Sequence, residues 1–395
     1  MRQGVLAIIP ARGGSKGVPR KNLRSFAGMP LIAHSIRHAM ASASVTRTIV
    51  STDDAEIADV ARRAGAEVID RPAELATDAA PSEPALLHAL EFLASRERFN
   101  PELVVFLQPT SPLRDSGDVD AAVGQLRAER ADSLLSACPS HDFHWTLRDG
   151  VGVPVNYDPS RRPRRQDMPP QFRENGSIYA MHAAGFEQYR CRLFGRVSVY
   201  SMPEERSLQI DRPEDFALLE AIHAAGQRRA LAPTLADLGL VVFDFDGVMT
   251  DNRVLVMQDG TEGVLCNRSD GLGLGMLKDA GVPVLVLSKE KNPVVAARCR
   301  KLGLECLQGI DDKLAHLRNL LDARGIAASK TAYVGNDLND LACMRHVGLP
   351  IAVRDAYPAV IDSARYVTQA RGGYGAVREV CDLILDARQS KETRP

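Results

Sequence analysis

The chain of 395 residues lacks the features that would direct it to a membrane, a nucleic acid or an oxidising compartment. No apolar run approaches the roughly 20 residues that span a bilayer. The formal net charge is only −1, so no broad basic field favours nucleic acid or an anionic membrane. The cysteines are odd in number, widely spaced and without a CxxC pair, which indicates a reducing compartment rather than a disulfide framework.

The N-terminal segment also lacks the marks of a secreted protein. MRQGVLAIIPARGG has no small-residue cleavage site, and an apolar strand pattern begins at Val5. We therefore expect a cytoplasmic protein that binds neither nucleic acid nor membrane. The length exceeds one ordinary hydrophobic core, which predicts two domains.

Strand-like and helix-like patterns alternate along the chain. The predicted strands of the first half are Val5–Pro10, Thr48–Ser51, Glu67–Ile69, Leu103–Leu107 and Ser133–Ala137. The predicted helices between them include Leu31–Ala41, Ala55–Ala64 and Pro84–Ser95. This alternation predicts an α/β fold with a mostly parallel sheet. Ligands of such sheets gather at the carboxyl ends of the strands, so the loops after the strands should converge on one site.

A domain boundary is predicted where a polar stretch with Pro233 precedes a fresh strand, Leu238–Phe243. We expect a first domain over residues 1–226, a linker over 227–237 and a second α/β domain over 238–388. The polar tail, residues 389–395, should be disordered.

The most informative segment is Ile8–Leu23, IIPARGGSKGVPRKNL, in which a strand enters a basic glycine-rich loop. Its glycines are Gly13, Gly14 and Gly17, and its cations are Arg12, Lys16, Arg20 and Lys21. Glycines let the backbone approach a ligand closely, and the cations neutralise phosphate. The loop is not a Walker motif, because no Gly-Lys-Ser/Thr ends it. It predicts a cradle for nucleotide phosphates.

The exact string resembles the signature of the acylneuraminate cytidylyltransferases, and the resemblance covers about residues 3–222. Further blocks that carry it are STDD (51–54), RPAELATDAAPS (71–82), LQPTSPLR (107–114), SACP (136–139), RPRRQDMPPQFRENGSIY (162–179) and IDRPEDF (210–216). The family implies a Rossmann-like nucleotidyltransferase domain with a dimerisation insertion, which we expect around Pro139–Pro170.

The resemblance also implies the chemistry: the anomeric hydroxyl of a nonulosonic acid attacks the α-phosphorus of CTP, and pyrophosphate leaves. Arg12 and Lys21 would neutralise the transferring group. The implied nucleotide-binding residues are Arg12, Gly13, Gly14, Lys16, Lys21, Asn22, Arg71 and Ser82. The implied sugar-binding residues are Gln108, Thr110, Ser111, Arg165, Gln166, Arg173 and Tyr179. Without the resemblance of residues 162–179, the basic run Arg161–Arg165 alone would indicate only a solvated loop.

Two acidic positions leave alternatives open. Asp53 follows a predicted strand and either caps the next helix or takes part in catalysis. The family shows two aspartates, one residue apart, that bind Mg²⁺, whereas this chain has Gln209 and Asp211. Gln209 is a poorer Mg²⁺ ligand than a carboxylate, so Asp211 is the expected ligand, with help from Asp215 or the CTP phosphates.

The second domain opens with a buried strand that ends in DFDGVMT, residues 244–250. This pattern resembles the haloacid dehalogenase (HAD) superfamily of phosphatases. Asp244 would be the nucleophile, and Asp246 the general acid and base. Ser288 and Lys313 match the phosphate-binding hydroxyl and lysine. GNDLND, residues 335–340, would supply carboxylates for Mg²⁺, so the implied metal ligands of the chain are Asp211, Asp244, Asp246 and Asp337, with Asp340 as support.

Three longer segments narrow this resemblance to small, capless sugar-acid phosphatases that act on 3-deoxy-octulosonate 8-phosphate or nonulosonate 9-phosphate. They are residues 267–282, 302–313 and 371–385. Too little sequence separates Thr250 from Ser288 for a large cap. These phosphatases are tetramers, and Arg371–Arg378 could reach an active site, its own or a neighbour's. We therefore expect a homo-oligomer, a dimer through the first domain and a tetramer through the second.

Together the two domains predict a bifunctional enzyme: one dephosphorylates a nonulosonate 9-phosphate, and the other activates the free acid with CTP. One alternative is a cytidylyltransferase whose second domain only assists assembly. Another is a 3-deoxy-octulosonate cytidylyltransferase. The sequence does not choose among N-acetylneuraminate, its deaminated form KDN and a bacterial relative such as legionaminate.

Overall fold

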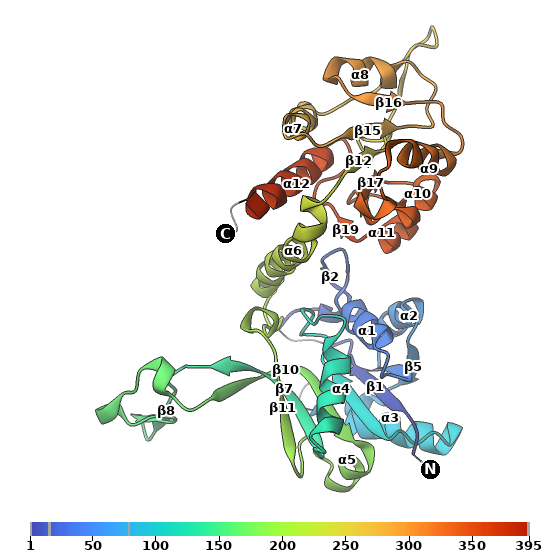
Figure 1. Cartoon of the computed structure of the whole chain (residues 1–395). Helices are drawn as coiled ribbons and strands as arrows, with labels where there is room; N and C mark the ends of the chain where they lie inside the picture. The colour runs from blue at the N-terminus through green and yellow to red at the C-terminus, as the bar shows by residue number, and fades with distance from the viewer. Residues whose placement is uncertain (1, 15–16, 78–79, 393–395) are drawn as a thin grey trace. The chain divides into compact units, whose positions relative to one another are not determined.

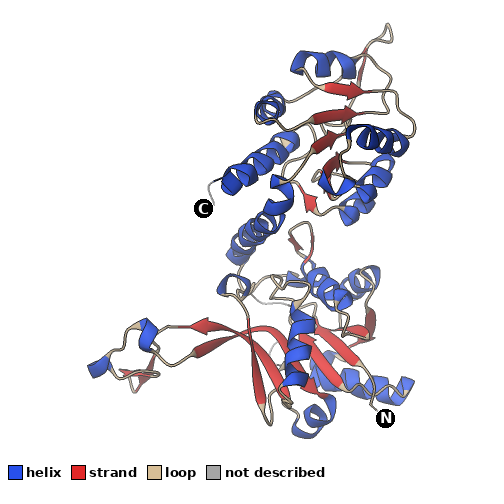
Figure 2. Ribbon diagram, in the orientation of Figure 1, coloured by secondary structure: helices blue, strands red, loops and turns tan. Residues whose placement is uncertain are grey.

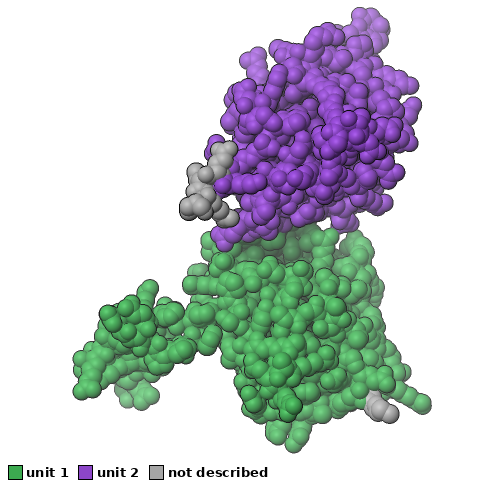
Figure 3. Space-filling view, in the orientation of Figure 1, with its two compact units in different colours: residues 1–224 green, residues 225–395 purple. Residues whose placement is uncertain are grey.

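The computed structural model of the chain describes residues 2–14, 17–77 and 80–392. It divides into two compact units, residues 1–224 and 225–395, coloured separately in Figure 3. Among the described residues, no helix is both long and apolar enough to cross a membrane.

The first unit is built on a seven-stranded sheet with the order β11-β7-β10-β6-β1-β4-β5. Its strands are β1 (Val5–Pro10), β4 (Arg47–Thr52), β5 (Glu67–Asp70), β6 (Leu103–Leu107), β7 (Ser133–Ser140), β10 (Gln171–His182) and β11 (Val197–Ser201). Only β10 runs antiparallel to its neighbours. The predicted α/β class with a mostly parallel sheet is therefore confirmed.

Helices cover both faces of this sheet, because alternate residues of β1 point to opposite sides. Val5, Ala7 and Ile9 pack in one buried cluster with α1, α2 and α4. Leu6 and Ile8 pack in another with α3 and α5. The helices are α1 (Leu31–Ala41), α2 (Ala55–Arg63), α3 (Ser82–Glu97), α4 (Asp118–Ala128) and α5 (Ala183–Tyr189), shown in blue in Figure 2.

Two small hairpins complete the first unit. One joins β2 (Ser25–Phe26) to β3 (Met29–Pro30), and the other joins β8 (Trp145–Arg148) to β9 (Val151–Pro154). The second hairpin belongs to a segment that we call the arm, residues 141–170, between β7 and β10. Figure 1 shows the arm extending away from the sheet, where the sequence predicts an insertion.

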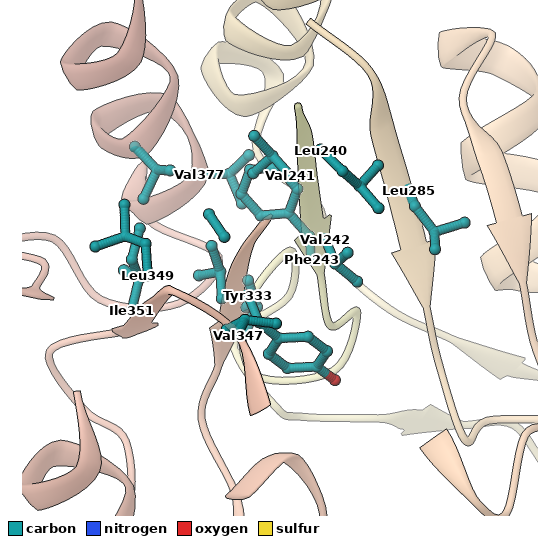
Figure 4. Packing of buried hydrophobic residues seen from close by; sticks show 14 of the residues in the cluster. Leu240, Val241, Val242, Phe243, Leu285, Tyr333, Val347, Leu349, Ile351 and Val377 are labelled. Atoms are coloured by element: carbon teal, nitrogen blue, oxygen red, sulfur yellow. The ribbon is translucent and has the colours of Figure 1, made fainter. Parts of the chain in front are cut away.

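The second unit has a six-stranded parallel sheet with the order β16-β15-β12-β17-β18-β19. Its strands are β12 (Leu240–Phe243), β15 (Val284–Leu287), β16 (Glu305–Leu307), β17 (Thr331–Gly335), β18 (Leu349–Ala352) and β19 (Tyr366–Val367). Its helices are α7 (Arg268–Asp279), α8 (Val294–Leu302), α9 (Lys313–Arg324), α10 (Leu341–His346), α11 (Pro358–Ser363) and α12 (Ala376–Glu392). Figure 4 shows the side chains of β12 packed among those of its neighbours in the core.

Only a short hairpin, β13 (Leu255–Val256) with β14 (Glu262–Gly263), and α7 lie between Thr250 and β15. The predicted absence of a large cap over the second unit therefore agrees with the structure. Only these small elements are available in this segment to cover the carboxyl ends of the strands.

The predicted linker, residues 227–237, is almost entirely helical. It forms the end of α6 (Pro213–Ala236), which continues through Pro233. Leu231 and Leu235 are one helical turn apart and are buried in the core of the second unit, which explains the helix. The predicted disordered tail is likewise helical up to Glu392, and residues 393–395 lie outside the described residues.

Candidate active sites

The glycine-rich loop after β1 is held by two carboxylates that follow β4. The backbone N–H of Gly13 donates to Asp53 Oδ1 at 3.0 Å, and Arg20 Nη1 donates to Asp54 Oδ2 at 2.6 Å. Asp54 also accepts the N–H of Ile57 and so caps α2. The capping role considered for Asp53 is therefore wrong: Asp54 is the cap, and Asp53 anchors the loop.

A cavity of about 540 Å³ opens at the carboxyl ends of β1 and β6. Many of the residues predicted to bind the nucleotide or the sugar line it together: Arg12, Lys21, Asn22, Arg71, Ser82, Gln108 and Thr110. Gln209 and Asp211 also line it. Segments far apart in sequence thus converge on one polar cavity, as the sheet topology predicts.

The cations of this cavity are held by main-chain oxygens. Lys21 Nζ donates to the carbonyl of Ile210 at 2.7 Å and lies 3.4 Å from Asp211 Oδ1. Arg12 Nη1 donates to the carbonyl of Thr77 at 2.6 Å. Arg71 is buried and donates to Ser51, and its burial lowers the pKa of its guanidinium. These partners place three cationic side chains around the cavity, and Lys21 is also ion-paired with Asp211.

Several predicted residues do not line the cavity: Gly13, Gly14, Ser111, Arg165, Gln166, Arg173 and Tyr179. The Ser111 side chain is buried and donates to the carbonyl of Asn175 at 3.4 Å. The Tyr179 ring stacks on Phe106, which does line the cavity, at 5.4 Å between centroids. Arg165 and Gln166 lie on the arm. Lys16 lies outside the described residues.

The predicted Mg²⁺ site of the first unit keeps a carboxylate at Asp211. At its other position, Gln209 has an amide that bonds to the protein. Gln209 Nε2 donates to the carbonyl of Asn175, which belongs to β10. Asp211 is exposed, and its backbone N–H donates to Asp215 Oδ2 at 2.8 Å. Asp215 thus anchors the start of α6, and Asp211 is left as the carboxylate at the cavity wall.

The sequence reasoning missed other residues of this wall, notably Leu75, Thr77 and Pro81. All three lie in the quoted block of residues 71–82, so the signal was present. Arg192 was also missed. Its guanidinium lies 5.1 Å from the Phe106 centroid and 4.9 Å from that of Tyr179, and its Nε donates to Glu83 at 2.6 Å.

In the second unit, Lys313 joins two buried aspartates. Its Nζ lies 2.8 Å from Asp244 Oδ1 and 2.8 Å from Asp340 Oδ1. Asp340 also accepts the Tyr333 hydroxyl and the backbone N–H groups of Asn336 and Asp337. Asp340 is therefore saturated by neighbours, which suits the supporting role predicted for it.

Burial and the charge of Asp340 together raise the pKa of Asp244 to about 7, although Lys313 opposes the shift. Burial and the charge of Glu290 raise the pKa of Asp246. For Lys313, burial lowers the pKa, but the charges of Asp244 and Asp340 outweigh it, and the net shift is upward. An additional cation beside Asp244 would therefore favour its ionised form.

A second cavity, of about 430 Å³, opens beside this constellation, and Asp244 lines it whereas Lys313 and Asp340 do not. Its lining includes the predicted residues Asp244, Asp246, Ser288 and Asp337. Lys289, Glu290, Lys291, Asn252 and Asp311 line it as well and were not predicted. Lys289, Glu290 and Lys291 directly follow the predicted Ser288, and Asp311 lies in the quoted segment 302–313, so these four positions were accessible from the sequence pattern.

A glycine segment, Arg371–Gly375, packs on the loop that follows Asp246. The N–H of Gly373 donates to the carbonyl of Val248 at 3.0 Å, and the Tyr374 hydroxyl accepts from Arg253 Nη2 at 3.2 Å. A Cβ on Gly372 would lie 1.9 Å from the carbonyl oxygen of Gly247. The segment thus supports the site of its own chain.

Comparison with known proteins confirms both family resemblances. Residues 6–235 match the model of the cytidylyltransferase family, and residues 298–378 match that of the haloacid dehalogenase-like hydrolases. An N-acylneuraminate cytidylyltransferase from Oncorhynchus mykiss is 33% identical over 395 residues, which cover 97% of this chain and 89% of the relative. An N-acylneuraminate cytidylyltransferase A from Danio rerio is also 33% identical, over 96% of this chain and 88% of the relative.

The second unit has relatives of its own. A 3-deoxy-D-manno-octulosonate 8-phosphate phosphatase from Escherichia coli K12 is 40% identical over 153 residues, which cover 38% of this chain and 81% of the relative. A solved phosphatase of the same name from Moraxella catarrhalis, in complex with magnesium, phosphate and KDO, is 34% identical, with a TM-score of 0.40. That match covers 42% of this chain and 95% of the solved one.

Proposed function

The chain belongs to the cytidylyltransferase family and carries a haloacid dehalogenase-like hydrolase unit, and from this premise we propose a bifunctional enzyme of nonulosonic acid activation. The first unit transfers CMP from CTP to a nonulosonic acid. The second unit removes phosphate from a sugar-acid phosphate. The observation that carries the proposal is the convergence of Arg12, Lys21 and Arg71 with Gln108 on one cavity.

In the first unit, the anomeric oxygen of the sugar acid forms a bond to the α-phosphorus of CTP while the bond to the β-phosphate oxygen breaks. Arg12 and Lys21 stabilise the charge of the transferring phosphoryl group and of the departing pyrophosphate. Asn22 and Ser82 contact the nucleoside, and Gln108 and Thr110 orient the acid. Arg71 extends the positive wall.

Mg²⁺ is the cation that we propose for both units, where it would neutralise phosphate charge and act as a Lewis acid. Asp211 fits as a single carboxylate ligand in the first unit. In the second unit, the buried Oδ1 of Asn336 has no hydrogen-bond partner and lies in the wall of the cavity with Asp244 and Asp337. These oxygens suit a hard cation. Among the described residues, these two sites included, no group of three acidic, histidine or cysteine side chains is arranged to hold a metal ion, so phosphate oxygens of the substrate would complete each set of ligands.

In the second unit, the Asp244 carboxylate attacks phosphorus and the sugar hydroxyl leaves with a proton from Asp246. Water then attacks the aspartyl phosphate, Asp246 takes its proton, and Asp244 and phosphate are released. Lys313 and Ser288 hold the phosphate oxygens. The substrate that connects the two reactions is the 9-phosphate of the nonulosonic acid used by the first unit.

We further propose that the chain works as a homo-oligomer. Arg165 and Gln166 lie on the arm, outside the cavity of their own chain, so they fit a sugar-binding role only in the cavity of a second copy. The arm exposes Leu147, Val151 and Val155 by 75%, 65% and 62%, which suits a contact between copies.

The test is a substrate panel with CTP and Mg²⁺, in which pyrophosphate is measured with N-acetylneuraminate, KDN, legionaminate and 3-deoxy-octulosonate. The proposal predicts pyrophosphate and a CMP-sugar with at least one nine-carbon acid. Turnover with 3-deoxy-octulosonate alone would contradict it.

A further inference from the structure

Arg114 is a fully buried guanidinium beneath the first cavity. It ends the segment LQPTSPLR, whose residues Gln108, Pro109 and Thr110 line the cavity. Only 4% of Arg114 is exposed. The acid whose charge acts on it, Asp118, is ion-paired with Arg206 instead. Burying a cation without a paired carboxylate costs free energy. The hydrogen bonds that Arg114 donates therefore identify the groups that it holds in place.

Those hydrogen bonds join three elements. Nη1 donates to the Ser177 carbonyl at 2.8 Å, to Ser177 Oγ at 3.1 Å and to the Gln108 carbonyl at 3.3 Å. Nη2 donates to the Gln108 carbonyl at 3.2 Å and to Ser35 Oγ. Arg114 therefore ties the loop after β6 to β10 and to α1.

The tie lies directly behind the side chain of Gln108. A Cβ on Gly176, the neighbour of Ser177, would lie 2.5 Å from Gln108 Oε1, so β10 and the Gln108 side chain are in close approach. A shift of the Gln108 main chain relative to Ser177 would move this amide in the cavity wall. The fork geometry of a guanidinium suits such a double anchor, whereas an ammonium cannot reproduce it.

The surrounding charges do not compensate Arg114. Burial lowers its pKa to about 9, and Asp118 opposes this shift. Burial, with a smaller contribution from the charge of Arg114, lowers the pKa of both His34 and His38. The neighbouring imidazoles are thus neutral near pH 7. Arg114 keeps its positive charge, which the five hydrogen bonds that it donates stabilise.

We propose that Arg114 is a positioning residue that fixes Gln108 for recognition of the acceptor acid. The inference rests on the proposed function of the first unit. It assigns Arg114 no contact with substrate, and it predicts an effect on the acid that is separate from any effect on CTP.

The experiment uses the full chain and steady-state pyrophosphate release with the nonulosonic acid that the wild type accepts. Arg114→Met should raise the KM for the acid about tenfold or more and leave the KM for CTP within about threefold, because anchors to a charged group are lost. Arg114→Lys should rescue part of the effect. Arg47→Lys is the matched control, since Arg47 pairs with Glu67 and Glu97 away from the cavity and should alter neither KM.

Ser35→Ala removes one hydrogen-bond partner of the same guanidinium. This variant tests the positioning role if Arg114→Met does not fold. It should raise the KM for the acid about two- to fivefold. Equal changes in both KM values, or an unchanged KM for the acid in Arg114→Lys and Ser35→Ala, would overturn the inference. Absence of pyrophosphate from the wild type with every acid would instead refute the proposed function, and this inference with it.

Discussion

Asp244 is the side chain on which the proposed second activity depends most directly. Asp244→Asn keeps the shape of the side chain but removes the nucleophilic carboxylate, so phosphate release should fall about a thousandfold or more. Pyrophosphate release should be unchanged, because Asp244 is not among the residues that line the first cavity. Asp259→Asn, in an exposed turn, is the matched control. Phosphate release at the wild-type rate from Asp244→Asn would show that the phosphatase reading is wrong.

His34 should make the first unit sensitive to acid. Burial, with smaller contributions from the charges of His223, Arg37 and Arg114, lowers its pKa from 6.5 to about 4, although the hydrogen bond to Phe26 opposes the shift. Between these values the unfolded chain binds a proton that the folded chain does not, so stability falls as the pH falls from 6.5 towards 4. The loss is up to about 1.4 kcal/mol per pH unit for this group.

His34→Gln keeps an N–H donor that can reach the Phe26 carbonyl, which His34 Nε2 contacts at 2.8 Å, but it does not titrate. Urea unfolding followed at several pH values should show a shallower acid loss for this variant than for the wild type. Burial also lowers the pKa of His38 and His223, so part of the slope should remain. Identical slopes in the two proteins would contradict the assignment.

Residue types and their order along the chain predicted about half of the residues that line the first cavity, because side chains that follow parallel strands meet at one edge. The partner of each group could not be predicted. The N–H of Gly13 is taken by Asp53, and Tyr179 is packed behind Phe106. Arg114 is visible in the motif LQPTSPLR, but its burial and its hold on Ser177 depend on a strand more than sixty residues away.

At the scale of elements, the segment Arg371–Gly375 should support the phosphatase site. Gly372→Ala would place a methyl group against the backbone of Gly247, which cannot move aside as a side chain could. We expect phosphate release to fall about tenfold or more, within the range of small-to-large changes in packed sites, with pyrophosphate release unaltered. Gly275→Ala is the control, because its Cβ would meet no atom within 4 Å. Equal rates of phosphate release by the two variants would show that this segment does not support the phosphatase site.

Element boundaries were predictable where burial follows a simple period. Strand β1 and helix α1 begin and end where the sequence predicts, at Val5–Pro10 and Leu31–Ala41. The helical state of the predicted linker was not evident from its polar residues and Pro233, because Leu231 and Leu235 bury one face of a continuous helix. That burial is a tertiary effect and outweighs the local preference of one proline.

At the scale of the whole molecule, the arm should hold copies of the chain together. Leu147→Asp changes a side chain that is 75% exposed, so the fold of the single chain should not change. The variant should have a lower molar mass by light scattering than the wild type and a raised KM for the acid, since Arg165 would no longer reach a second cavity. Equal molar masses of the variant and the wild type would show that the arm does not hold copies of the chain together.

The most direct test of the central claim is a single reaction that contains the full chain, Mg²⁺, CTP and either KDN 9-phosphate or N-acetylneuraminate 9-phosphate. If both units act as proposed, phosphate appears first, and pyrophosphate and a CMP-sugar without phosphate at C9 follow. Asp244→Asn should stop the sequence before any product forms, and added free acid should restore the CMP-sugar. A wild-type chain that makes CMP-sugar from the free acid but never from either 9-phosphate would contradict the account of the second unit.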